Sequence, residues 1–125
     1  ARVPMVLEIA DLTVGVERAI PLGLMINELV SNAYRHGYDA DTAAGRIVIR
    51  LAARLDGRVG LEVRDDGRGL PSDFGAGRAS TLGMQLVRTL AQQLGAELDW
   101  ETGPEGTCFR IVFALDVRAA QTESM

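Results

Sequence analysis

The sequence predicts an α+β domain, a two-layer α/β sandwich in which helices cover one face of a mixed, mostly antiparallel sheet. Two segments, 18–36 and 81–94, carry apolar residues at helical spacing. Four others alternate apolar and polar residues, as strands with one buried face do. An element with one apolar face needs a second layer to cover it, so the helices and the sheet are expected to pack together.

The chain opens with a short strand at 3–10, which is expected at a sheet edge because Pro4 cannot donate to a ladder. The helix at 18–36 follows. Pro21 suits its first turn, where the missing N–H costs nothing, and Gly37 suits its C-terminal cap. The stripe that this helix is expected to bury consists of Leu22, Met25, Ile26, Leu29 and Ala33.

The middle of the chain is typical of a hairpin followed by a long connection. After a loop at 38–44, strands at 46–54 and 59–64 are joined at Asp56-Gly57, a strong two-residue turn signal. The residues expected to face the core are Ile47, Ile49, Leu51, Val59, Leu61 and Val63. Residues 71–80 have little apolar content, and a connection of this length is usually a functional loop or a lid.

The second helix, at 81–94, is predicted from leucines at four-residue steps and ends at Gly95. Those leucines are Leu82, Leu86, Leu90 and Leu94. Strands at 96–101 and 107–115 follow, joined by a turn at 103–106. Their inward residues are expected to be Leu98, Trp100, Phe109, Ile111, Phe113 and Leu115. We therefore expect a single domain over 1–125 with its core at 3–115 and a frayed tail at 116–125.

Composition limits the class of function. The 125 residues carry 13 basic and 17 acidic side chains, a net charge of −4 without a basic cluster, so nucleic-acid binding is not expected. No apolar run is long enough to span a membrane and no signal peptide opens the chain, so no membrane contact is expected. The single cysteine, Cys108, is predicted to be a small buried side chain and fits a reducing, cytoplasmic compartment.

The basic residues are all arginine. A Walker-type phosphate loop, a protein-kinase strand lysine and a Schiff-base mechanism each need a lysine, and this chain has none. If the protein handles a nucleotide, it does so with another architecture.

Polar residues on the first helix form the first candidate site. Glu28, Asn32, Arg35 and His36 stand about one and two turns apart and are expected to point away from the apolar stripe. A carboxylate can take a proton, a carboxamide can give a metal a neutral oxygen, and a guanidinium can meet a phosphate. The alternative is a surface helix whose outer face is simply solvated.

Two later segments are also candidates. Asp65-x-Gly67-x-Gly69 ends a strand, where a carboxylate can accept hydrogen bonds from an exocyclic amine and glycines allow a flat ligand to approach; the alternative is a plain turn. The segment 80–84 opens the second helix, and helix N-termini bind phosphates, although Ser80 or Thr81 can equally be an N-cap. Gly106-Thr107 could add a hydroxyl to the same pocket.

Together and in this order, these elements resemble the Bergerat-fold ATPases, with an N box and three glycine boxes. The most similar group is the catalytic, ATP-binding domain of bacterial sensor histidine kinases, in particular a subgroup with a short lid. The runs that carry the resemblance are 21–37, Gly69-Leu70-Pro71 and 82–87, and the resemblance covers residues 3–115.

The resemblance implies a role for each matched position, with ATP and Mg²⁺ as cofactors. Glu28 would be the catalytic general base or polarise the transfer, and Asn32 would bind Mg²⁺. Asp65 would bind the adenine amine, Thr107 would support the adenine end, and residues 81–84 would close on the phosphates. The residues that it places around the nucleotide are Asn32, Arg35, His36, Asp65, Gly67, Gly69, Leu70, Thr81, Leu82, Gly83, Met84 and Thr107.

The sequence departs from the family pattern at three points. The second glycine box has only Gly83 where two spaced glycines are usual, and Arg35 stands where lysine is frequent. The only histidine, His36, lies inside the nucleotide motif, where the resemblance places it, with Arg35, near the phosphates. The phosphoacceptor histidine and its dimerising helices are therefore expected to lie outside this chain, which alone would bind ATP without autophosphorylating.

The resemblance implies in-line transfer of the γ-phosphoryl group to a histidine on a separate dimerisation domain, with a response regulator as an indirect partner. Two alternatives remain. One is a regulator of the anti-sigma-factor type, which shares the fold and phosphorylates serine on a partner. The other is a degenerate module that senses ATP without transferring phosphate; the presence of Glu28, Asn32 and Asp65 argues against it.

Overall fold

A computed structural model describes residues 5–9, 13–37, 45–70 and 82–114, with only the backbone of His36 and Gly37. These residues form two helices and a five-stranded sheet of order β1-β2-β3-β5-β4. β1 runs parallel to β2 and the other neighbours are antiparallel, which confirms the predicted mixed sheet. In chain order the elements are β1 (Met5–Ile9), α1 (Val16–Gly37), β2 (Ile47–Ala53), β3 (Arg58–Asp65), α2 (Leu82–Leu94), β4 (Glu97–Gly103) and β5 (Gly106–Ala114).

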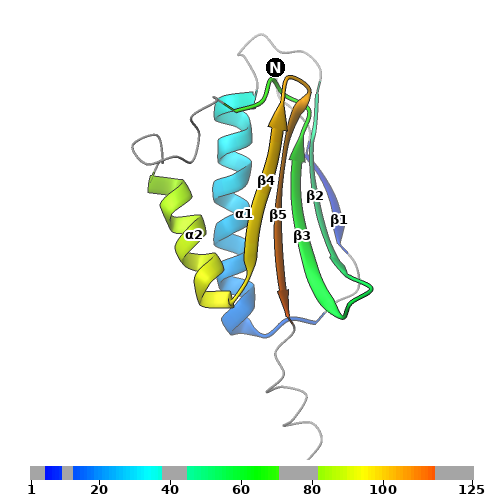
Figure 1. Cartoon of the computed structure of the whole chain (residues 1–125), viewed down its shortest axis with the longest axis vertical. Helices are drawn as coiled ribbons and strands as arrows, with labels where there is room; N and C mark the ends of the chain where they lie inside the picture. The colour runs from blue at the N-terminus through cyan, green and yellow to red at the C-terminus, as the bar shows by residue number, and fades with distance from the viewer. Residues whose placement is uncertain (1–4, 10–12, 38–44, 71–81, 115–125) are drawn as a thin grey trace, which may run out of the picture.

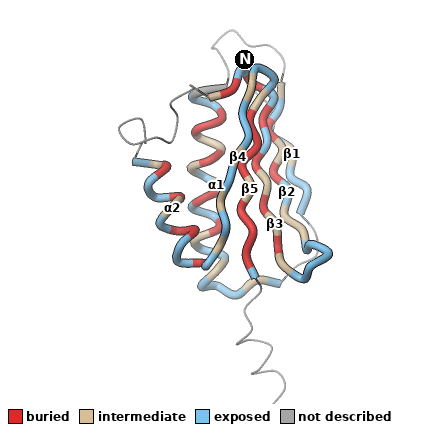
Figure 2. Tube along the Cα trace, viewed as in Figure 1, coloured by how far each residue is buried: buried red, intermediate tan, exposed pale blue. Residues whose placement is uncertain are grey.

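The two helices lie side by side on one face of the sheet, which makes the predicted two-layer sandwich (Figure 1). α1 packs on β3 and β5, and α2 packs on β4. Figure 2 shows that both helices and strands β2, β3 and β5 contain buried residues. Fully burying one large apolar side chain contributes about 1.5–3 kcal/mol, so the side chains buried between the helices and the sheet contribute most to stability. The most completely buried of these side chains include Met25, Leu29, Ile47, Leu61, Met84, Ile111 and Phe113.

The strands match the predicted pattern. The residues of β2 and β3 expected to face the core are buried, apart from Leu51, which is half-buried against it. The hairpin turns at Asp56-Gly57, where Gly57 has a φ of 84° and its N–H donates to the Arg54 carbonyl at 3.1 Å. Trp100 packs on the core, with its ring centroid 5.5 Å from that of Phe109.

β1 lies at the edge of the sheet, as predicted. Its residues Met5, Leu7 and Ile9 share a face with Ile47 and Ile49 of β2 but are exposed. These side chains are exposed because α1 packs on β3 and β5 rather than on this edge of the sheet. Neither helix is long and apolar enough, in the part of the chain that the structure describes, to cross a bilayer.

α1 begins two residues earlier than expected. The Gly15 carbonyl accepts the N–H groups of Arg18 and Ala19 at 3.0 and 2.9 Å, which starts the helix at Val16. Pro21 therefore lies inside the helix, in its second turn, and its placement in the first turn is wrong. At this depth its missing N–H removes an i→i−4 bond to the carbonyl of Glu17.

α2 buries a different stripe from the one expected. Leu82 is 81% exposed and Leu86 is also exposed, so only the last two of the four leucines reach the core. A four-residue step overshoots a helical turn by roughly 40°, and the leucines drift around the helix. The buried stripe consists of Met84, Val87, Leu90, Ala91 and Leu94.

The predicted end of α2 at Gly95 is confirmed. Gly95 has a φ of 64°, and its N–H donates to the Gln92 carbonyl at 3.0 Å. The N–H of Ala96 donates to the Ala91 carbonyl at 2.8 Å, which completes a Schellman cap. The expected loop at 38–44, the lid at 71–80, Leu115 and the tail at 116–125 lie outside the described residues.

The face of the sheet away from the helices carries a row of charges across its five strands. In register these residues are Glu8, Arg50, Glu62, Arg110 and Asp99. The sign alternates at every step. The Arg50 guanidinium lies 3.1 Å from the Glu8 carboxylate, and both are about half exposed. Exposed cross-strand pairs of this kind contribute about 0.2–1 kcal/mol each, so they fix register more than they add stability.

Candidate functional site

The predicted polar residues converge on one end of the sandwich. The C-terminal half of α1, the end of β3, the end of β4 and the start of β5 all meet there, at the upper end in Figure 1. The register places Asp65 opposite Thr107, which in turn lies opposite Thr102. These three side chains project toward the helix layer, because Val63 and Phe109, two residues along their strands, belong to the core.

Asp65 is a buried carboxylate, 9% exposed. Its Oδ1 accepts the N–H of Gly67 at 2.9 Å, and the carboxylate also accepts the backbone N–H of Thr107. Burial raises the pKa of Asp65, the two N–H groups oppose that shift, and neighbouring Asp66 adds to it. The group is a rigidly held acceptor at the end of a strand, as the sequence predicted for a residue that binds an amine.

Asn32 differs from the expectation that it points away from the core. It is only 1% exposed and lies on the buried stripe, at three-residue spacing from Leu29. Its Oδ1 and Nδ2 are both buried, and neither has a hydrogen-bond partner among the described residues. A buried polar group without a partner costs about 1–3 kcal/mol, so this carboxamide is disfavoured in the chain without a ligand.

The other α1 candidates whose side chains the structure describes are less buried than Asn32. Glu28, one turn before Asn32, is half-buried, whereas Arg35 is exposed. The backbone of His36 continues the helix, and its side chain lies outside the described part. The structure therefore brings Glu28 and Asn32 to the boundary of the core and leaves Arg35 on the solvent side.

The loop after β3 is tied to the β4–β5 hairpin. Gly69 has a φ of 86°, and a Cβ built on it would lie 2.2 Å from the carbonyl oxygen of Gly103. The N–H of Leu70 donates to Thr102 Oγ1 at 2.8 Å. Glycine at 69 is thus required by close packing on the end of β4, a reason that differs from the expected approach of a flat ligand. Gly67 is buried beside Asp65.

Thr102 was missed by the sequence reading. Its Oγ1 lies 2.8 Å from Thr107 Oγ1, and the Thr107 side chain is buried. The signal that could have revealed it is a hydroxyl residue just before the turn at 103–106, directly opposite Thr107 across a tight hairpin.

The start of α2 contributes less than expected. Leu82 is exposed and Gly83 is half-buried, while the side chain of Met84 is fully buried in the core. Met84 therefore serves packing, and only its backbone is available to a phosphate. Thr81 lies outside the described residues.

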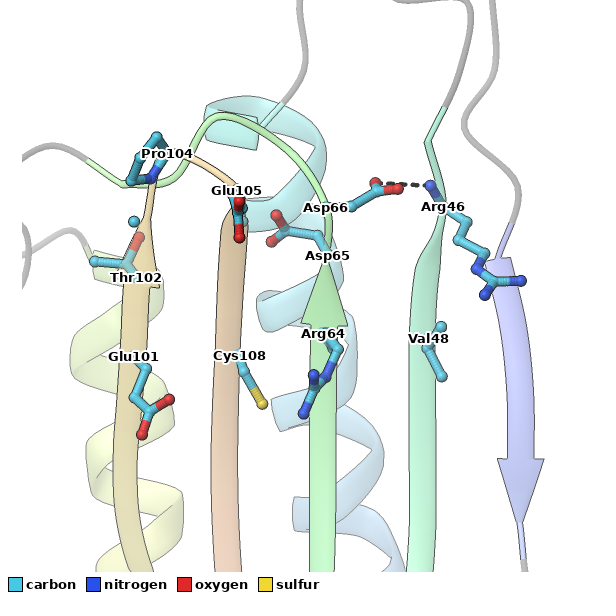
Figure 3. A pocket seen from close by; sticks show the side chains of 12 residues that line it. Arg46, Val48, Arg64, Asp65, Asp66, Glu101, Thr102, Pro104, Glu105 and Cys108 are labelled. Carbon is cyan, nitrogen blue, oxygen red and sulfur yellow. Dashed lines mark hydrogen bonds between the residues drawn. The ribbon is translucent and has the colours of Figure 1, made fainter.

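A hollow of about 760 Å³ opens at the same end of the sheet, on the face away from the helices (Figure 3). Val48, Arg64 and Cys108 line it, and the Asp66 Oδ1 that accepts the Arg46 N–H at 2.9 Å stands at its rim. Asp65 and Thr102 also line the hollow, whereas Glu28 and Asn32 do not, so it adjoins the candidate site at the strand ends. The Cys108 side chain is buried, as predicted, but on the outer face of the sheet rather than in the core. This burial raises the pKa of its thiol.

Comparison with known proteins matches residues 17–117 to the family described as histidine kinase-, DNA gyrase B- and HSP90-like ATPase. The chain is 38% identical over 98 residues to blue-light-activated histidine kinase 2 of Erythrobacter litoralis, covering 78% of this chain and 28% of that protein. It is 44% identical over 87 residues to the sensor histidine kinase PdtaS of Mycolicibacterium smegmatis, covering 70% of this chain and 17% of that protein. The chain thus spans less than a third of these curated relatives.

Solved structures of histidine kinases superpose on this chain. A histidine kinase domain from a blue-light-activated histidine kinase of Erythrobacter litoralis superposes with a TM-score of 0.82 at 34% identity, covering 90% of this chain and 52% of that one. The Acinetobacter baumannii histidine kinase AdeS, at 18% identity, has a TM-score of 0.71, covers 91% of this chain and 55% of that one, and supports the fold alone. With this family match and these relatives, the chain belongs to the histidine kinase-, DNA gyrase B- and HSP90-like ATPase family, and its ATPase domain is similar to those of sensor histidine kinases.

Proposed function

We propose that this chain is the catalytic domain of a two-component sensor histidine kinase, and that it transfers the γ-phosphoryl group of ATP to a histidine on a phosphoacceptor and dimerisation domain. The family is one of ATPases, so ATP is the nucleotide that the fold accommodates. The relatives of 38% and 44% identity are histidine kinases, which favours histidine over the serine of an anti-sigma-type kinase. A response regulator would receive the phosphoryl group in turn.

The buried carboxamide of Asn32, which has no hydrogen-bond partner among the described residues, is the observation that carries this proposal. Its Oδ1 is the neutral oxygen that suits Mg²⁺, a hard cation that prefers oxygen ligands, so the residue fits the metal. When bound, Mg²⁺ would neutralise charge on the transferring phosphates. Burying an amide without a partner is unfavourable in the free domain, and a ligand at this position would relieve that cost.

The remaining roles in this proposal are those that the family resemblance implies. Asp65, held by two N–H groups, would accept the exocyclic amine of adenine, and Thr107 would support the same edge of the base. Glu28, one turn from Asn32, would act as the general base or polarise the accepting group. Arg35 would meet phosphate oxygens from the solvent side. The wall of the nucleotide site would include Gly67, Gly69 and Leu70. His36 and residues 81–84 would complete the proposed site.

The location and extent of the domain are also proposals. ATP chemistry and a single cysteine fit the reducing cytoplasm. The family match at 17–117 fits one catalytic domain over 1–125, with the phosphoacceptor part in a separate domain.

The test is calorimetric titration of the 125-residue chain with ADP and a non-hydrolysable ATP analogue, with and without Mg²⁺. Asp65→Asn should weaken binding more than tenfold, because one acceptor oxygen for the amine becomes a donor. Asp66→Asn is the matched control: it changes the adjacent exposed carboxylate and should leave the affinity within about twofold. A folded wild-type chain that binds neither nucleotide would refute the proposal.

A further inference from the structure

A chain of hydrogen bonds connects the loop after β3 to the base-binding end of β5. The N–H of Leu70 donates to Thr102 Oγ1 at 2.8 Å, and the hydroxyls of Thr102 and Thr107 lie 2.8 Å apart. Thr107 is buried beside Asp65, which is opposite it in the sheet. The three bonding groups come from three segments, and Thr102 is the link between the other two.

The direction of this chain follows from its first member. A backbone N–H can only donate, so Leu70 occupies an acceptor position on Thr102 Oγ1. Hydroxyls in a chain strengthen one another when all bonds run the same way, because a hydroxyl that accepts is a better donor. The favoured arrangement is therefore Leu70 N–H to Thr102, and Thr102 O–H to Thr107. The O–H of Thr107 is then left to donate into the site.

The resulting pair of groups distinguishes one base edge from another. Asp65 presents a carboxylate, which accepts, and Thr107 presents an O–H, which donates. Adenine offers the complement: an exocyclic amine beside a ring nitrogen that accepts. Guanine offers the reverse along its O6 and N1–H edge, so both contacts would be mismatched.

We propose that Thr102 is a positioning residue that sets the hydrogen-bond direction at Thr107 and thereby the preference for adenine over guanine. This inference rests on the nucleotide-binding function proposed above. Thr102 does not touch the base; it acts through the hydroxyl of Thr107. Without its O–H, Thr107 can rotate freely between donating and accepting, and its contact with the ring nitrogen loses directional support.

The experiment compares wild type, Thr102→Val and Thr102→Ser by calorimetry with ADP, GDP, 1-deaza-ADP and 7-deaza-ADP. The two deaza compounds each lack one ring nitrogen that flanks the amine. In wild type, 1-deaza-ADP, which lacks the N1 acceptor, should bind about fivefold more weakly than ADP, as expected for one lost hydrogen bond, and 7-deaza-ADP should bind like ADP. In Thr102→Val that penalty should fall below twofold and the ADP-over-GDP preference should shrink, while Thr102→Ser should keep both.

These ratios separate positioning from structural damage. A variant that is merely less stable loses the same fraction of its binding for every ligand, so the ratio of two ligands stays at the wild-type value. A Thr102→Val chain with unchanged deaza penalty and unchanged ADP-over-GDP preference overturns the inference while leaving nucleotide binding in place. A wild-type chain that does not bind ADP overturns the proposed function and this inference with it.

Discussion

The carboxamide of Asn32 illustrates how one residue can be disfavoured by folding and favoured by binding. It occupies a position on α1 where an apolar side chain would pack, and its two polar atoms meet no partner in the described part of the chain. Backbone and side-chain polar groups at such depth are almost always paired in folded proteins. This exception to the rule is why we propose Asn32 as a ligand-binding residue.

Replacing Asn32 by leucine should separate these two effects. Asn32→Leu removes the unpaired amide and should raise the free energy of unfolding of the nucleotide-free chain by about 1–2 kcal/mol, measured by urea denaturation. The same variant should lose the Mg²⁺-dependent part of ATP-analogue binding. Asn27→Leu, an exposed change on the same helix, should alter neither quantity by much. If Asn32→Leu destabilises the chain instead, the amide has a partner that the free domain supplies.

At the scale of the element, the loop at 66–70 owes its position to backbone packing. Gly69 lies so close to the end of β4 that no side chain fits between them, and the Leu70 N–H is anchored on the same strand. At the start of β5, a Cβ on Gly106 would lie 2.1 Å from the carbonyl oxygen of Asp65 at the end of β3. Two glycines thus let β3, β4 and β5 converge, and that convergence places Asp65 beside Thr107.

Two glycine variants distinguish close packing from backbone conformation. Gly57 and Gly69 have nearly the same φ, 84° and 86°, but a Cβ on Gly57 would meet nothing within 4 Å. Gly57→Ala should therefore cost only the conformational term, about 1 kcal/mol of unfolding free energy. Gly69→Ala adds a backbone clash and should cost about 2 kcal/mol more, and it should weaken ADP binding as well. Equal losses in the two variants would contradict the packing argument.

At the scale of the whole molecule, the dependence of stability on pH should report the state of Asp65. Because burial raises its pKa above the ordinary 3.8, the folded chain keeps this proton over a pH range in which the unfolded chain has released it. The contribution of Asp65 to stability is therefore greatest at low pH and falls as the pH rises through the folded-state pKa. Asp56 has the opposite sign, since the N–H of Arg58 lowers its pKa.

The comparison that isolates this effect is wild type against Asp65→Asn, unfolded by urea at a series of pH values from 3.5 to 7. The asparagine cannot ionise, so the unfolding free energy of the variant should rise relative to wild type as the pH increases above about 3.8. Asp56 and the other carboxylates cancel in the difference. A flat difference across this range would show that Asp65 titrates alike in both states.

The elements were largely predictable because their patterns are local. Alternation identified the buried faces of β2, β3 and β5, and the glycines at 57 and 95 located a turn and a helix end. The stripe of α2 was misplaced because its leucines follow a four-residue step that drifts around the helix. Pro21 predicts the first turn of a helix, because that is its commonest helical position, but it lies in the second turn of α1.

The site was less predictable because its contacts are not local. Asn32 is polar by sequence, and its burial depends on elements distant in the chain that pack on α1. The bond between Leu70 and Thr102 joins residues 32 positions apart, and no sequence pattern announces it. Asp65 and Thr107 could be identified individually, and their register supplied the pairing. The close packing of Gly69 on Gly103 could not be predicted from the sequence either.

The alternating row of charges on the outer face of the sheet also bears on how copies of the chain meet one another. The row ends with an acid at each edge, Glu8 on β1 and Asp99 on β4. A sheet edge is a template for another strand, and an open template at both ends allows growth into fibrils. Any edge of a second copy aligned at this level would bring carboxylate against carboxylate. The charges that hold neighbouring strands in register therefore also disfavour extension of the sheet beyond five strands.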